Sequence, residues 1–223
     1  MIYFDNYDAF STRGELAIPI RIYLTRDGEK TVSYTRESDL TLAKELDLLD
    51  GDELFSEDTK KKIADHYDAL CGSLGYSPEF AVSTYFQIKS RERLNKSFIL
   101  ESSEVLMPDN GYENLTEFEP EPGYEDLLCF GTVIDGKLVS VASENPGMIE
   151  DDDHRDIAVE TAEGYEGMGY GTSNVAALTY YLLDPGITVT YTVSDDNIRS
   201  KRIAEKLGFE PAARELCFLC YRD

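Results

Sequence analysis

The stretch from Asp156 to Gly171 reads D-I-A-V-E-T-A-E-G-Y-E-G-M-G-Y-G. It has β-branched residues and then glycines at alternate positions: Ile157, Val159 and Thr161, followed by Gly167, Gly169 and Gly171. Residues 172–183 then repeat apolar side chains with helical spacing. A strand, a glycine turn and a helix in this order predict an anion site, because glycine lets the backbone approach an anion and a helix start offers unpaired N–H groups. The turn fits neither the P-loop nor the dinucleotide-binding pattern, so a flexible turn without a ligand is the open alternative.

The length and composition of the chain indicate one large globular domain or two smaller ones. The chain has 223 residues, of which 42% are hydrophobic and 11% aromatic, which is enough for a substantial core. No apolar run approaches the roughly 18 residues that a membrane span needs, and residues 1–8 lack the features of a signal peptide. We therefore expect a soluble, cytoplasmic protein with no membrane partner.

Acidic residues dominate the chain and are concentrated in its second half. The formal net charge is −23. Residues 1–96 hold 13 Lys and Arg against 18 Asp and Glu, whereas residues 97–223 hold 8 against 26. Such a field repels nucleic acid and anionic membranes and attracts cations. We therefore expect no nucleic-acid partner. The alternative is that the acidity only keeps the protein in solution.

The four cysteines do not suggest a disulfide or metal framework. Cys217 and Cys220 have the C-x-x-C spacing of redox and metal motifs, but they lie in the apolar run E-L-C-F-L-C-Y, which is typical of a buried strand. Residues three apart on a strand face opposite sides. Since there is no second C-x-x-C and the chain has only two histidines, we expect no metal site.

The rest of the pattern predicts an α+β N-terminal region, residues 1–95, and a second region, residues 96–223. In the first region an Asp-Gly hairpin joins two strands, and three helices follow. Ser56 fits the N-cap of the second helix and Pro78 the first turn of the third, whereas glycines at 72 and 75 end the second. The expected ranges are 15–25 and 30–36 for the strands, and 37–50, 56–71 and 80–93 for the helices.

The second region alternates short strands with two helices. An Asp-Gly hairpin near residue 135 joins two of the strands. The expected strands cover 97–107, 127–134, 138–143, 157–161, 187–193 and 216–221, and the expected helices cover 172–183 and 197–207. Two acidic loops, 108–126 and 150–155, complete this part of the chain.

A second motif begins some thirty residues after the glycine turn. Residues 194–209 read S-D-D-N-I-R-S-K-R-I-A-E-K-L-G-F, a helix that Asn197 caps and Gly208 ends. Together the two motifs resemble the acyl-CoA half of the GNAT N-acetyltransferase superfamily, and most closely a bacterial subgroup with an uncharacterised N-terminal region. The resemblance covers about residues 97–221. It implies an α/β (α+β) fold in which the C-terminal GNAT domain has a mixed, splayed central sheet flanked by helices.

The resemblance also implies acetyl-CoA as the cofactor and gives roles to particular residues. Backbone N–H groups of the turn would hold the CoA pyrophosphate, at Gly167, Met168, Gly169, Tyr170, Gly171 and Thr172. The strand before the turn would pair with the pantetheine amides, main chain to main chain, at Ile157, Val159 and Thr161. Splaying between this strand and the next would admit the thioester. Asn197 would bind the pantetheine arm, and Ser200 would lie near the cofactor.

Three residues depart from the family pattern. Glu166 stands where the family usually has Arg or Gln, and Met168 where it often has a basic residue. A carboxylate facing a pyrophosphate would weaken binding. Ala204 stands where the family often has a tyrosine as general acid, so water or another hydroxyl would protonate the thiolate. Glu160 is our first choice for the base and His154 the second, with a structural role as the alternative for both.

We expect an enzyme that transfers an acetyl group from acetyl-CoA to a small cationic amine, with protein amines as the next choice. Two alternatives stay open. The chain could be a GNAT-fold module that binds acyl-CoA without turnover, or residues 1–95 could bind a partner while the GNAT half acts as a scaffold. A homodimer is also open. The acidic loop 150–153 runs into the strand that would pair with the cofactor, so we expect it near the acceptor slot.

Overall fold

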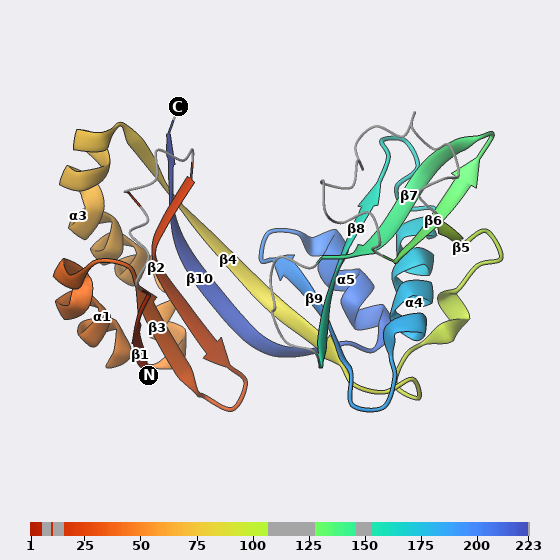
Figure 1. Cartoon of the computed structure of the whole chain (residues 1–223), viewed down its shortest axis with the longest axis horizontal. Coiled ribbons are helices and arrows are strands. Elements are labelled where there is room, and N and C mark those ends of the chain that lie inside the picture. Colours follow the sequence, from red (N-terminus) through yellow and green to blue (C-terminus); the bar gives the residue numbers. More distant parts are fainter. Residues whose placement is uncertain (6–9, 11–15, 107–127, 146–152, 223) are drawn as a thin grey trace. The chain divides into compact units, whose positions relative to one another are not determined.

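The computed structural model describes residues 1–5, 10, 16–106, 128–145 and 153–222 of the chain (Figure 1). These residues form two compact units. Unit 1 comprises Met1–Tyr85, Ser194–Asp196 and Pro211–Asp223, and unit 2 comprises Phe86–Val193 and Asn197–Glu210. The expected loop 108–126 and residues 150–152 of the acidic loop lie outside the described residues. No helix in the described part is long and apolar enough to cross a membrane.

Unit 1 packs helices on one face of a sheet. In strand order its sheet runs β1-β3-β2-β10-β4, with β1 parallel to β3 and β2 antiparallel to both β3 and β10. The strands are β1 (Ile2–Phe4), β2 (Leu16–Thr25), β3 (Lys30–Tyr34), β4 (Tyr76–Ile88) and β10 (Glu210–Arg222). The helices are η1 (Glu37–Asp39), α1 (Leu40–Asp47), α2 (Gly51–Leu54) and α3 (Glu57–Leu74).

The core of unit 1 lies between these helices and the sheet (Figure 1). Leu46 of α1 and Tyr67 of α3 are almost completely buried, as are Ile22 of β2 and Phe218 of β10. The Tyr67 and Phe218 rings stack with centroids 5.0 Å apart. Burial of such side chains is the main favourable term in folding.

Unit 2 contains the strand and glycine turn of residues 156–171 and the helix that follows them. Its strands run in the order β4-β9-β8-β7-β6-β5, where only the last residues of β4 belong to this unit. Strands β5 to β8 are antiparallel neighbours, whereas β8 and β9 are parallel, so the sheet is mixed. The elements are η2 (Lys96–Phe98), β5 (Glu104–Leu106), β6 (Cys129–Ile134), β7 (Lys137–Glu144), β8 (His154–Thr161), α4 (Tyr170–Leu182), β9 (Thr188–Ser194) and α5 (Ile198–Leu207).

Both helices of unit 2 share one hydrophobic core with the sheet. Val175 and Leu178 of α4 and Leu207 of α5 pack with Ile157 of β8 and Val189 of β9, and all five side chains are fully or almost fully buried. The strands alternate between this helix-covered face and the opposite face. This alternation decides on which side each candidate site residue lies.

Local turn and cap signals are confirmed. Ser56 Oγ caps α3 by accepting a hydrogen bond from the Thr59 N–H, and Gly75 ends the helix with φ 72°. Asp135 and Gly136 both have positive φ, 52° and 76°, in the two-residue turn between β6 and β7, as a type I′ hairpin requires. The glycine at position 72 does not end α3, because the helix continues to Leu74.

One predicted helix is wrong. The segment expected as a helix over 80–93 is the strand β4, Tyr76–Ile88. Its β-branched and aromatic residues favour a strand, and Phe86 and Ile88 alternate into the core. Pro78, which we assigned to a helix start, lies near the beginning of the strand, where proline is tolerated. The expected strand 97–107 is also mostly wrong, because this segment is a 3-10 turn followed by the short strand β5. The last strand, β10, starts six residues earlier than expected.

The predicted boundary between residues 95 and 96 stays a prediction. The two units are defined by which residues pack together, and β4 and β10 each contribute residues to both of them.

Candidate functional site

The parallel strands β8 and β9 pair over only part of their length. Their register begins at His154 and ends where Ile157 lies opposite Tyr191, whereas β8 continues to Thr161. On its other edge, β8 stays paired with β7 up to Thr161. The backbone of residues 158–161 therefore has no register partner in β9, and the splay that we expected between these strands is confirmed.

The glycine turn after β8 has the geometry of an anion site. Gly167 and Gly169 have φ values of 76° and 90°, in the left-handed region that glycine tolerates best. A Cβ atom at either position would meet nothing within 4 Å, so the space beside the turn is open. Gly169 is the N-cap of α4, which starts at Tyr170. The N–H groups of the first helical turn lack intrahelical acceptors and lie at the positive end of the helix dipole, so these residues fit a phosphate group.

Gly171 has a packing role in addition. It is buried within the first turn of α4, and a Cβ atom there would lie 3.0 Å from Thr161 Oγ1. That distance is too short for an ordinary contact, so glycine lets α4 approach the end of β8. Thr161, which we assigned to cofactor pairing, therefore also touches the helix start.

A buried polar network fixes the first turn of α4. The Asn174 side chain is fully buried. Its Oδ1 accepts hydrogen bonds from Ser103 Oγ at 2.6 Å and Thr132 Oγ1 at 3.1 Å, and its Nδ2 donates to the Ser140 carbonyl at 3.0 Å. These bonds tie α4 to β6 and β7. Because buried polar networks are rigid when all their members are paired, the helix start is held in place before any ligand binds.

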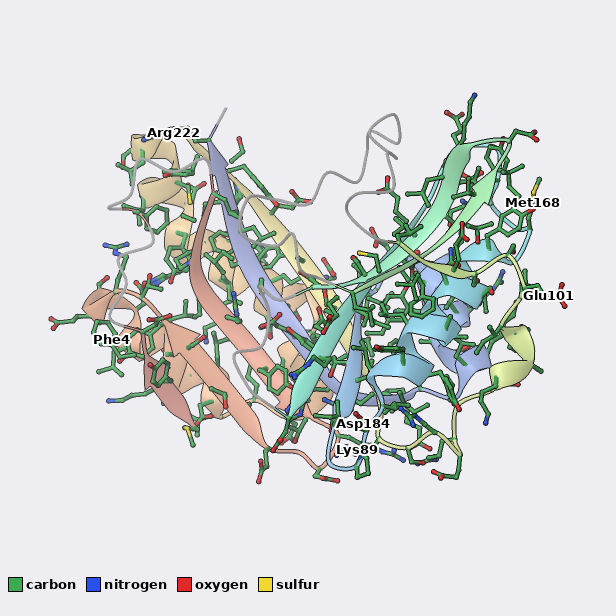
Figure 2. All side chains as sticks on the ribbon, turned by 45° about the vertical axis from the view of Figure 1, so that its right-hand side comes forward. Phe4, Lys89, Glu101, Met168, Asp184 and Arg222 are labelled. Carbon is green, nitrogen blue, oxygen red and sulfur yellow. The ribbon has the colours of Figure 1, made fainter. Side chains whose placement is uncertain are left out.

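Glu166 does not project freely from the turn. Its Oε2 accepts a hydrogen bond from the Gly164 N–H at 2.8 Å, and its Oε1 lies 3.7 Å from Arg199 Nη1. Hydrogen bonds from the backbone N–H groups of Glu166 and Gly164, together with Arg199, lower the pKa of this carboxyl. The carboxylate thus helps to shape the turn, and Arg199 places a cation beside it. The Met168 side chain points outward and is 56% exposed (Figure 2).

The helix α5 begins with the second predicted motif. Asn197 Oδ1 accepts a hydrogen bond from the Ser200 N–H at 3.0 Å, so the Asn197 side chain caps the helix. Gly208 ends α5 with φ 92°. Ser200 and Ala204 are four residues apart and share one face of α5, and Ala204 is completely buried.

Asp156 is a candidate functional residue that we did not select from the sequence. It is 4% exposed, and its carboxylate accepts hydrogen bonds from Thr192 Oγ1 at 3.2 Å and Asn145 Nδ2 at 3.1 Å. Burial raises the pKa of this carboxyl to about 6, although the hydrogen bonds work against the rise. It lies next to Ile157, where the β8–β9 register ends. Nothing in the sequence signals that Asp156 is buried, because the two side chains that bind its carboxylate, Asn145 and Thr192, come from other parts of the chain.

The two residues that we chose as bases lie on the same strand but apart from each other. His154, Asp156 and Glu160 occupy even positions, so they lie on the face opposite α4 and α5. Glu160 is four residues beyond Asp156 and His154 two residues before it, which is about 13 Å and 7 Å along a strand. The structure therefore does not combine Glu160 and His154 into one site. In the described part of the chain, no three His, Cys, Asp or Glu side chains form a metal-binding group.

Comparisons with known proteins agree with this geometry. Residues 147–219, about a third of the chain, match the model of the FR47-like protein family. A GNAT-family protein from Novosphingobium aromaticivorans has a similar structure, with a TM-score of 0.51 and 20% identity over 67% of this chain and 69% of its own. No curated protein is detectably similar in sequence.

Two further solved structures extend the likeness over most of the chain. A GCN5-related N-acetyltransferase-like protein from Streptococcus suis has a TM-score of 0.51 and 19% identity, covering 95% of this chain and 87% of its own. A functionally unknown conserved protein from Staphylococcus epidermidis has a TM-score of 0.56 and 13% identity, covering 83% and 79%. The fold is thus that of GNAT acetyltransferases. Fold and family model agree: the chain has the GNAT fold, and its residues 147–219 match the FR47-like family.

Proposed function

We propose that this protein is an acetyl-CoA-dependent N-acetyltransferase that acts on a small cationic amine. The observation that carries the proposal is the end of the β8–β9 register beside a glycine turn that opens α4. In this fold, a turn that suits a phosphate group and the part of β8 beyond its register with β9 then lie next to each other. When bound, acetyl-CoA would supply the activated acyl group.

The chain's own residues would hold that cofactor at two places. N–H groups of the turn, from Gly167 to Thr172, would bind the pyrophosphate, and Arg199 would add a positive charge beside them. The main chain of residues 158–161 would pair with the pantetheine amides, as a peptide adds to a sheet edge. Asn197 and Ser200 at the start of α5 would contact the pantetheine arm.

Asp156 is the base that the geometry favours for the acceptor. An amine must lose its proton before its lone pair can attack an acyl carbon, and a general base works best when its pKa lies near the operating pH. The pKa of Asp156, about 6, leaves the carboxylate ionised at pH 7 and able to take a proton at Oδ1 or Oδ2. Glu160 and His154 remain the alternatives on the same face of the sheet.

Charge supports a cationic acceptor. Residues 97–223 contain 26 Asp and Glu against 8 Lys and Arg, and such a field raises the local concentration of polyamines or aminoglycoside-like cations. A protein amine is the second choice, and nucleic acid and membranes are disfavoured.

A second candidate is a GNAT-fold module that binds acyl-CoA without turnover. The observation in its favour is Ala204, which is completely buried and offers no hydroxyl on the inner face of α5. Calorimetry with CoA, followed by measurement of free thiol released from acetyl-CoA with a panel of amines, separates the two. Binding with amine-dependent thiol release supports the enzyme. Binding without release from any amine supports the module, and no binding overturns both.

A further inference from the structure

Tyr191 of β9 carries a buried hydroxyl group that has no hydrogen-bond partner among the residues that the structure describes. The side chain is 3% exposed. Nearly all buried side-chain polar groups in native proteins are hydrogen-bonded, and an unpaired one destabilises the fold. A buried hydroxyl without a partner therefore suggests a contact with a ligand, and the proposed cofactor site includes no role for it.

The position of Tyr191 in the sheet is informative. Tyr191 is the last residue of β9 in register with β8, where it lies opposite Ile157. Its side chain belongs to the core under α5, with Ala204 and Leu207, and its ring contacts the Phe209 ring at a centroid distance of 6.2 Å. The Tyr191 hydroxyl thus lies on the helix-covered face, at the level where the two strands separate.

The Ser200 side chain lies near this hydroxyl. Burial raises the pKa of Tyr191, and Ser200 lies close enough to offset part of the rise without reaching hydrogen-bonding geometry. A tyrosine with a raised pKa stays protonated at neutral pH. It can therefore donate a hydrogen bond throughout a reaction without losing its proton.

The opposite face at the same level carries Asp156. Asp156 lies opposite Thr190 in the register, one position before Tyr191, and it is hydrogen-bonded to Thr192. Because neighbouring residues of a strand point to opposite faces, Asp156 and the Tyr191 hydroxyl flank the point of separation from the two sides. A proton acceptor therefore stands on one side and a hydrogen-bond donor on the other.

We propose that Tyr191 Oη donates a hydrogen bond to the sulfur atom of the thioester, in place of a donor from α5. The inference rests on the proposed function. The amine nitrogen forms a bond to the acyl carbon, the carbon–sulfur bond breaks, and its electron pair goes to sulfur. Asp156 takes the proton of the amine, and the thiolate is protonated by solvent. Donors aimed at an atom where negative charge develops stabilise the transition state more than the ground state.

Tyr191→Phe tests this contact, because it removes the hydroxyl and keeps the ring against Phe209. The probes are CoA and dethio-CoA, an analogue in which hydrogen replaces the thiol. We expect Tyr191→Phe to weaken CoA binding about two- to tenfold, in line with the loss of one hydrogen bond, and to leave dethio-CoA binding unchanged. With a turned-over amine, kcat should fall about ten- to a hundredfold, while KM for acetyl-CoA changes much less.

Two further measurements keep the test decisive. The free protein should be as stable as wild type or more stable, because the variant removes an unpaired buried hydroxyl. Tyr181→Phe, at a tyrosine that is 60% exposed on α4, is the matched control and should behave as wild type in every assay. Equal weakening of CoA and dethio-CoA, or no change with either, would overturn the contact with sulfur while leaving the proposed function standing. Failure of the wild-type protein to bind either probe overturns both.

Discussion

Asp156 and Thr192 are joined by a side-chain hydrogen bond, Thr192 Oγ1 donating to Asp156 Oδ1 at 3.2 Å. Thr192 is the first residue of β9 beyond the end of its register with β8. A side-chain bond therefore connects the strands at the place where their backbone pairing stops. It holds a buried carboxylate at that point, on the face away from α4 and α5.

Asp156→Asn should reduce turnover and remove a pH-dependent loss of stability. The variant keeps the shape and a hydrogen-bond acceptor but cannot take a proton, so kcat should fall about 10²- to 10⁴-fold. In the folded protein the pKa is about 6, raised from an ordinary value of 3.8. Because the folded protein binds this proton more tightly than the unfolded chain does, protonation of Asp156 stabilises the fold. This stabilisation is fully present below about pH 4 and is lost as the pH rises through 6.

The wild-type protein should therefore lose on the order of 2–3 kcal/mol between pH 4 and 7 that the Asn variant keeps. Urea unfolding of both proteins at several pH values measures this difference. Asp153→Asn serves as a control for a nearby charge. Parallel stability curves for wild type and Asp156→Asn would show that the carboxyl titrates normally, and wild-type kcat in the variant would remove Asp156 as the base.

Gly169→Asp should abolish CoA binding while the fold survives. Gly169 has φ 90° and open space around it, so a side chain there meets no atom but places a negative charge where the pyrophosphate would lie. Gly169→Asn is the matched control, because Asn imposes the same backbone strain without the charge. We expect the Asp variant to bind CoA at least about tenfold more weakly than the Asn variant. Calorimetry gives both affinities, and unchanged CoA affinity in a folded Gly169→Asp protein rules the turn out as the site.

Glu166→Arg should raise the affinity for CoA, most clearly at low salt. The exchange replaces a negative charge near the turn by a positive one, and the effect of such charges is screened as salt rises. The Glu166 carboxylate also binds the Gly164 N–H, and Arg cannot accept this bond. Glu166→Gln separates the two effects, because its side-chain oxygen keeps the acceptor and loses the charge.

We expect both Glu166 variants to bind CoA more tightly than wild type at low salt, by about fivefold for Gln. A Gln variant that binds as wild type at low salt would mean that the carboxylate does not act on the phosphates. A weaker Arg variant beside a tighter Gln variant would assign the loss to the broken Gly164 contact.

Sequence alone predicted the parts of this fold that depend on local chemistry. Three such features are the Ser56 cap, the Asp135–Gly136 turn and the glycine turn before α4. Each requires particular residues at particular backbone angles, so the local sequence is sufficient to predict it. β4 was predicted as a helix because Pro78 suits the first turn of a helix. Its neighbours in the sheet, β9 and β10, come about a hundred residues or more later. Pairing with these distant strands, and not the local sequence, therefore makes residues 76–88 a strand.

The same reason explains what was missed in the site. Asp156 is buried because Asn145 and Thr192 cover its carboxylate from other parts of the chain, and Tyr191 is buried because α5 packs over it. Neither residue differs in the sequence from an ordinary strand residue. Glu160 and His154 were our choices for the base, and neither choice anticipated the buried carboxylate of Asp156 between them on the same strand.

Asn174→Ala should destabilise unit 2 and loosen the start of α4. The substitution leaves the buried groups of Ser103, Thr132 and Ser140 without their shared partner, which should cost about 2–4 kcal/mol. Hydrogen exchange should become faster in the first turn of α4, and CoA binding should weaken because the helix start is no longer fixed. Ser103→Ala removes one member only and should cost less. A stability equal to wild type for Asn174→Ala would mean that the network does not hold the helix.

The acidic loop 150–153 should contribute to the choice of acceptor. Residues 151 and 152 lie outside the described residues, but the Asp153 carbonyl accepts a hydrogen bond from the Thr188 N–H at 2.8 Å, at the start of the β8–β9 register. The loop therefore leads directly into the strand that carries Asp156, His154 and Glu160. A polyamine or aminoglycoside would be attracted to its carboxylates, and the rate of its capture should fall steeply with ionic strength.

Changing Asp151, Asp152 and Asp153 together to Asn tests this role, since the side chains keep their size and lose three charges. We expect kcat/KM for a polycationic amine to fall about tenfold at low salt and the salt dependence to become shallower, while CoA affinity stays the same or rises because three negative charges are gone. The same exchange at three exposed aspartates of α3 in unit 1, Asp58, Asp65 and Asp68, is the control for total charge. If kcat/KM and its salt dependence match wild type in the loop variant, the loop takes no part in acceptor choice, and the acidity of this region acts only on solubility.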